Sequence, residues 1–145
     1  MLKGIPAVIS PELMKTMMEM GHGDELVLAD ANFPAASHAQ RLVRSDCGIP
    51  TLLEAILGVF PLDSFVPHCV FMMKRVKGDD YKPFIWETYK EVVLKHEPNF
   101  KGAAMLDRFA FYDQARKAFA VVATAETARY ANLILKKGIV ETPTD

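Results

Sequence analysis

Cysteine is scarce in this sequence of 145 residues, which contains only Cys47 and Cys69. The two belong to no C-x-x-C pair, and two cysteines cannot build the disulfide framework of a small secreted domain. Together with eight methionines, this pattern favours a reducing compartment, although a single disulfide between the two stays open. The sequence therefore predicts a cytoplasmic protein.

The sequence also lacks a clear excess of basic or acidic residues, and it lacks long apolar runs. Seventeen basic residues stand against 18 acidic ones, for a formal net charge of −1, whereas nucleic-acid binding normally shows a basic patch and a high isoelectric point. No apolar stretch approaches the roughly 18 residues that are needed to cross a bilayer. The first ten residues reach Gly4 and Pro6 at once and do not resemble a signal peptide. We expect neither nucleic acid nor membrane among the partners.

Several motifs of catalysis are also absent. The four histidines show no H-x-x-x-H or H-E-x-x-H spacing, so a metal site has little support, although a zinc assembled from distant residues stays open. There is no G-x-S-x-G elbow and no phosphate-binding P-loop. The segment Gly21-His22-Gly23-Asp24 contains a G-x-G, but it follows an expected helix and opens an expected strand. A dinucleotide-binding loop has the reverse order.

Helical and strand patterns alternate along the chain. Apolar spacing predicts helices near residues 11–20, 50–60, 82–96 and 105–112, the last with Met105, Phe109 and Tyr112 on one face. Short apolar runs predict strands near residues 25–29, 41–45, 67–76, 119–123 and 133–135. This alternation favours one α/β domain over residues 1–145, a three-layer α/β/α fold with a largely parallel central sheet. In such sheets, ligands bind beyond the carboxyl ends of the strands.

Two of the residues near strand ends could take part in proton transfer. The glycines on both sides of His22 leave its backbone free and its ring uncrowded, and imidazole can give and accept a proton near neutral pH. His22 could equally be a loop histidine that caps a helix end. Asp30 follows an apolar strand, where its carboxylate could hold a sugar hydroxyl, orient a histidine or merely cap the next turn.

Polar groups that suit a polyhydroxylated ligand occur in the second half of the chain. Tyr130 and Asn132 lie two positions apart, which in an extended chain places both side chains on one face. A capped turn would use the same groups. Arg108 precedes a run of aromatic residues and is compatible with a ligand contact or with an ordinary solvated helix arginine.

Taken together, these segments resemble the sugar mutarotase family, which includes the D-ribose pyranase and L-fucose mutarotase branches. The resemblance extends from Leu2 to Gly138. Four segments carry it: LKGI at 2–5, GHGD at 21–24, LADANFP at 28–34 and ETARYAN at 126–132. A fifth, RFAFY at 108–112, favours the fucose branch, because the ribose branch tends to have histidine at its first position.

The resemblance implies an α/β enzyme that interconverts the α and β anomers of a free reducing sugar by opening and reclosing the ring without cofactor or metal. L-fucose is the sugar that we expect first. His22 would be the catalytic proton-transfer group. The residues implied in substrate binding are Asp30, Arg108, Tyr130, Ala131 and Asn132. Ala131 stands where the family often has glycine. A D-ribose pyranase and a non-catalytic monosaccharide-binding module remain the alternatives, because fold does not dictate activity.

The resemblance also implies a homo-oligomer. The family is known for decameric rings, with dimers in some members, and for sites that a neighbouring subunit completes. Nothing in the composition or periodicity of this chain tests that expectation.

Overall fold

A computed structural model describes residues 1–143, so the last two residues of the predicted domain lie outside the described part. The elements are α1 (Pro11–Glu19), β1 (Glu25–Ala29), α2 (Ala35–His38), β2 (Leu42–Arg44), α3 (Ile49–Leu57), β3 (Val70–Met73), α4 (Phe84–His96), β4 (Ala104–Leu106), α5 (Arg108–Lys117), β5 (Ala120–Ala123) and β6 (Leu133–Lys136). None of the described helices combines the length and the apolar character that a membrane span requires.

The six strands form one sheet in the order β2-β5-β1-β6-β3-β4. Parallel pairing joins β1 to β5, β2 to β5 and β3 to β4, whereas β6 runs antiparallel to both of its neighbours. The prediction of a largely parallel sheet is confirmed. The five parallel strands end at one side of the sheet, here called the carboxyl edge, and begin at the opposite side, the amino edge. Because β6 is reversed, it starts at the carboxyl edge.

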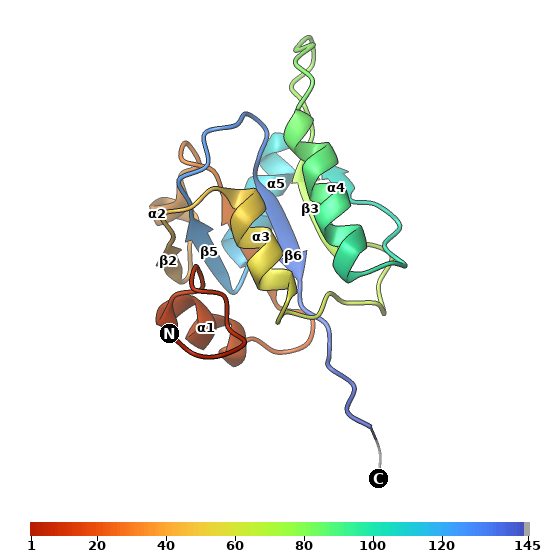
Figure 1. The fold of residues 1–145 in the computed structure, drawn as a ribbon. Coiled ribbons are helices and arrows are strands. Elements are labelled where there is room, and N and C mark those ends of the chain that lie inside the picture. The colour runs from red at the N-terminus through yellow and green to blue at the C-terminus, as the bar shows by residue number, and fades with distance from the viewer. Residues whose placement is uncertain (144–145) are drawn as a thin grey trace.

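Helices cover both faces of the sheet, as predicted. Side chains alternate between the two faces of a strand, so Leu26 and Leu28 of β1 contact one helix layer and Val27 and Ala29 the other. The first layer contains α1, α3 and α4, and the second contains α2 and α5. Figure 1 shows α3 and α4 in front of the sheet and α5 behind it. The three-layer α/β/α prediction is confirmed.

The expected helix over residues 105–112 is wrong in its first part. Met105 lies in β4, a strand of three residues that the sequence analysis missed, and α5 begins only at Arg108. Phe109 is 73% exposed, and the buried face of α5 consists of Phe111 and Ala115. Three residues are too few to show a periodic pattern in the sequence. The strand forms because it pairs with β3 in the sheet.

Candidate functional site

Asp30 and Asn132 meet at the carboxyl edge although 102 positions separate them. Asp30 is the first residue after β1, and Asn132 directly precedes β6. The Asp30 amide donates to Asn132 Oδ1 at 2.7 Å, and Asp30 Oδ1 accepts from the Asn32 amide at 2.9 Å. The structure therefore brings together two of the predicted substrate-binding residues, and the reversed direction of β6 is the reason.

The environment of Asp30 keeps its carboxylate basic. Burial raises the pKa of Asp30, and the Glu126 carboxylate acts in the same direction. The amides of Asn32 and Phe33 and the side chain of Asn132 oppose the shift without cancelling it. A carboxylate with a raised pKa in a half-buried position can accept a hydroxyl hydrogen bond strongly and can take part in proton exchange.

Asp30→Asn is expected to change how stability depends on pH. Because the pKa of Asp30 is raised in the folded protein, wild type loses stability relative to the variant as pH rises through the raised pKa. As pH rises from acidic to neutral, the unfolding free energy of Asp30→Asn should therefore increase relative to that of wild type. Urea denaturation at a series of pH values measures it. A constant difference across that range would contradict the expectation, and Asp80→Asn, at an exposed loop position, is the matched control.

Of the two conformations that the sequence left open for the segment before β6, an extended chain and a turn, the structure has the turn. Tyr130 has φ of 58°, the only positive φ of a non-glycine residue among residues 1–143. The backbone turns there, so the spacing of Tyr130 and Asn132 does not place them on one strand face. Trp86 Nε1 donates to the Tyr130 carbonyl at 2.8 Å, and the buried Tyr89 hydroxyl donates to the Ala131 carbonyl at 2.7 Å. Two aromatic residues of α4 thus fix the turn.

Arg108 lies at the same edge, at the start of α5 and directly after β4 and its one-residue connection. Its guanidinium is 5.6 Å from the centroid of the Tyr112 ring. The Tyr112 ring in turn contacts the Phe33 ring, with centroids 5.5 Å apart, and Phe33 belongs to the loop that begins at Asp30. Tyr112, to which the sequence assigned no role in the site, therefore connects Arg108 to this loop.

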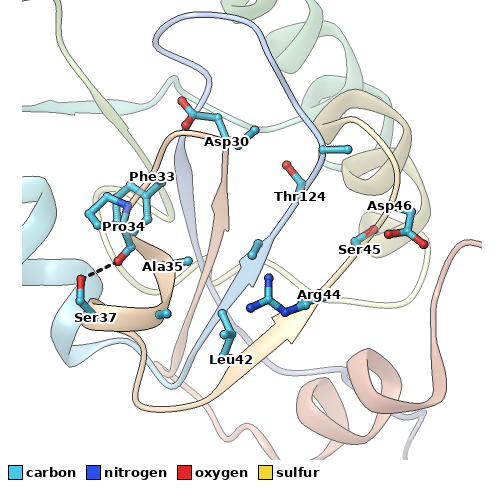
Figure 2. A pocket seen from close by; sticks show the side chains of 14 residues that line it. Asp30, Phe33, Pro34, Ala35, Ser37, Leu42, Arg44, Ser45, Asp46 and Thr124 are labelled. Carbon is cyan, nitrogen blue, oxygen red and sulfur yellow. Dashed lines mark hydrogen bonds between the residues drawn. The ribbon is translucent and has the colours of Figure 1, made fainter.

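A pocket of about 590 Å³ with a mixed polar and apolar lining opens at the carboxyl edge on the β2 side of Asp30. Figure 2 shows Arg44, Ser37 and Thr124 around it, with Asp30 at its rim. Asp30 is the one predicted site residue that lines this pocket. Asp30 therefore borders this pocket on the side of β2 and is hydrogen-bonded to Asn132 on the side of β6.

The structure does not bring His22 to these residues within one chain. His22 precedes β1 and Asp30 follows it, so the two lie at opposite edges of the sheet. The five residues of β1 span about 16 Å at about 3.3 Å per residue. Of the six predicted site residues, five lie at the carboxyl edge and the proposed proton-transfer group lies at the amino edge.

At the amino edge, His22 is paired with Asp63, a residue that the sequence analysis missed. His22 Nε2 lies 3.1 Å from Asp63 Oδ1, and the histidine side chain is 45% exposed while the aspartate is 3% exposed. Burial tends to raise the pKa of Asp63, but the Phe65 amide and His22 lower it overall. An ionised carboxylate can only accept, so the pair places a proton on Nε2 and leaves Nδ1 to exchange one. Asp63 is 41 positions from His22 and belongs to no motif, so nothing in the sequence indicated it.

The chain was compared with known proteins. The model of the RbsD / FucU transport protein family matches residues 3–140. A protein of Actinobacillus pleuropneumoniae serotype 5b (strain L20), named L-fucose mutarotase, is 48% identical over 140 residues, which are 96% of this chain and 97% of that protein. The protein of Homo sapiens named fucose mutarotase is 48% identical over 146 positions, covering 96% and 94% of the two chains. The crystal structure of the fucose mutarotase from Streptococcus pneumoniae in complex with L-fucose is similar with a TM-score of 0.92 and 53% identity, covering 97% of this chain and 100% of that one.

Proposed function

This chain belongs to the RbsD / FucU transport protein family, and from that premise we propose that it is an isomerase, a mutarotase that interconverts the α and β anomers of L-fucose. The observation that carries the proposal is the match over nearly the whole chain to fucose mutarotases, one of them solved with L-fucose bound. The resemblance to the L-fucose branch that the sequence analysis stated is confirmed.

The chemistry requires a proton donor and a proton acceptor around the sugar ring. The ring oxygen must gain a proton while the anomeric hydroxyl loses one, after which the aldehyde rotates and the ring closes on its other face. Positioned acid–base groups supply about 10²–10⁴-fold acceleration of such steps. No covalent nucleophile is needed.

The carboxyl edge provides the groups that would bind the sugar. The Asp30 carboxylate accepts from a sugar hydroxyl. Asn132 is 6% exposed and uses Oδ1 for the Asp30 amide, so its amide nitrogen stays available to donate. Arg108 and Tyr130 supply further polar groups, and Ala131 offers its backbone. Together they would retain the open-chain aldehyde until the ring recloses.

A second copy of the chain would supply His22. The imidazole lies beside a groove of about 470 Å³ lined mainly by apolar residues, and large apolar side chains around it are exposed: Met18 at 76%, Phe65 at 66% and Val140 at 72%. Exposed apolar patches of this kind mark protein–protein contacts. If the amino edge of one copy docks on the carboxyl edge of the next, the contact is heterologous, and heterologous contacts that close form rings. This supports a homo-oligomer; the decamer and the dimer remain predictions.

Mixing two inactive variants tests whether the site is shared. His22→Ala and Asp30→Asn each remove one component of every site. When the two chains are co-expressed and assemble at random, about one quarter of the shared sites combine an intact His22 with an intact Asp30, so about one quarter of the activity should return. If each site were formed within one chain, mixing would restore nothing. Each variant expressed alone is the control and should stay inactive.

The activity itself is tested by exchange NMR on free sugars. We expect saturation transfer between the anomers of L-fucose to accelerate strongly with the protein present, and less so for D-ribose and other hexoses and pentoses. Faster exchange of D-ribose than of L-fucose would favour the pyranase alternative. Binding of L-fucose without faster exchange would establish a non-catalytic binding module. The cytoplasmic location stays a prediction.

A further inference from the structure

The hydroxyl of Tyr130 is held by the loop that connects β3 to α4. This loop, residues 74–83, extends beyond the start of α4 at the top of Figure 1. The Tyr130 hydroxyl donates to Asp79 Oδ2 at 2.5 Å and accepts from the Val76 amide at 3.3 Å. Tyr130 and Asp79 are 51 positions apart, so the contact is a tertiary one.

We propose that Asp79 is a positioning residue of the sugar site, which acts by fixing the side chain of Tyr130. The proposal rests on the proposed function, in which Tyr130 contacts the sugar. Asp79 itself need not touch the sugar, because its effect passes through the tyrosine hydroxyl.

The Asp79 carboxylate is itself held in place from several directions. Its Oδ1 accepts from the Tyr81 amide at 3.0 Å, and its Oδ2 accepts from Arg129 Nη2 at 2.5 Å. The Arg129 guanidinium also lies 4.5 Å from the centroid of the Tyr81 ring, and the Tyr81 and Tyr130 rings are stacked with centroids 6.3 Å apart. A carboxylate with this many partners cannot turn away, so it determines where the tyrosine hydroxyl points.

The backbone of Tyr130 needs such support. Its φ of 58° lies in the left-handed region, which residues with a side chain adopt rarely and which persists where surrounding contacts enforce it. Trp86 holds the carbonyl of Tyr130, and Asp79 holds the hydroxyl. The segment from Asp79 to Trp86 therefore fixes the tyrosine at both its backbone and its side chain.

This arrangement limits what Tyr130 can offer a sugar. A tyrosine hydroxyl has one proton to donate and two lone pairs that accept. The proton is used on Asp79 and one lone pair on the Val76 amide. One lone pair remains, so Tyr130 recognises a sugar hydroxyl that donates. Without Asp79, the Tyr130 hydroxyl could rotate, and its proton would be available to donate to other acceptors.

The proposal is tested by steady-state kinetics of the Asp79→Ala variant, in its intact assembly, with L-fucose as the substrate. The rate is measured by polarimetry of a freshly dissolved anomer. We expect KM to rise about tenfold, with kcat within about twofold of wild type, because the lost contact contributes equally to the ground state and the transition state. Asp79→Asn should rescue most of the effect, since its amide oxygen can still accept from Tyr130. Asp80→Ala, at the exposed neighbouring position, should behave as wild type.

A double-mutant cycle separates positioning from a general effect on the loop. In the Tyr130→Phe background there is no hydroxyl to orient, so Asp79→Ala should change KM no further. An equal rise of KM in both backgrounds, or no rise in either, would overturn the proposal.

A second readout does not depend on activity. The ¹³Cζ resonance of Tyr130 can be identified by its absence in Tyr130→Phe, and Asp79→Ala should shift it whether or not the protein exchanges L-fucose. An unshifted resonance would overturn the proposal. If Asp79→Ala shifts the resonance but the wild-type protein does not accelerate the exchange of L-fucose anomers, the proposed function is contradicted and the role of Asp79 in positioning Tyr130 is still supported.

Discussion

His22→Ala is expected to slow the exchange of L-fucose anomers by about 10²–10⁴-fold, the usual contribution of a positioned acid–base group. The reason is that a buried carboxylate holds the imidazole, with Nε2 3.1 Å from Asp63. In the proposed shared site, the other nitrogen would transfer protons at the sugar of a neighbouring copy. Exchange NMR at a saturating concentration of L-fucose measures the rate.

Two further variants make this expectation specific. His68→Ala removes an exposed histidine of the loop before β3 and should leave the rate unchanged. Asp63→Asn keeps the size of the side chain but loses its charge, so the rate should fall by less than in His22→Ala. Equal rates for wild type and His22→Ala would remove His22 from the mechanism.

Gly138→Ala is expected to lower both stability and activity. A Cβ atom at position 138 would lie 2.5 Å from the Leu62 carbonyl oxygen and 2.9 Å from the Cα atom of Asp63. These are backbone atoms, which cannot move aside as a flexible side chain can. Overpacking of this kind costs about 1–3 kcal/mol of unfolding free energy. Because the displaced segment carries Asp63, the rate of anomer exchange should fall with it.

Urea denaturation and exchange NMR on the same samples measure the two effects. Gly21→Ala is the matched control for stability, since its Cβ would meet only Asp24 Oδ2, at an ordinary 3.7 Å. That substitution should raise stability by about 0.4–1 kcal/mol or leave it unchanged. A Gly138→Ala protein as stable as Gly21→Ala would show that the Leu62 segment adapts without cost.

Much of the fold could be predicted because its signals are local. The alternation of apolar runs with helical spacing identified every strand except β4, whose three residues are too few to show a period. The same local signals placed Asp30 at a strand end, where ligands of α/β proteins bind. The position of Asn132 beside it could not be predicted, because periodicity does not show the direction in which β6 runs.

The role of Tyr130 was predicted by resemblance, but its conformation was not. A positive φ at a tyrosine leaves no trace in the residue type, since it is enforced by contacts with Asp79 and Trp86. Asp63 was missed for a similar reason: its residue type and spacing are ordinary, and only the chain path brings it to His22.

The amino-acid sequence by itself determined the alternating α/β architecture, the membership in a family of sugar mutarotases and the chemical types of the groups that are predicted to bind the sugar. These follow from short segments, since side-chain periodicity and motif letters are properties of neighbouring residues. The tertiary structure alone decided which groups meet. It joined Asp30 to Asn132, paired His22 with Asp63 and placed the imidazole at the far edge of the sheet. Such meetings depend on strand order and direction, which arise from packing between segments that lie far apart in the chain.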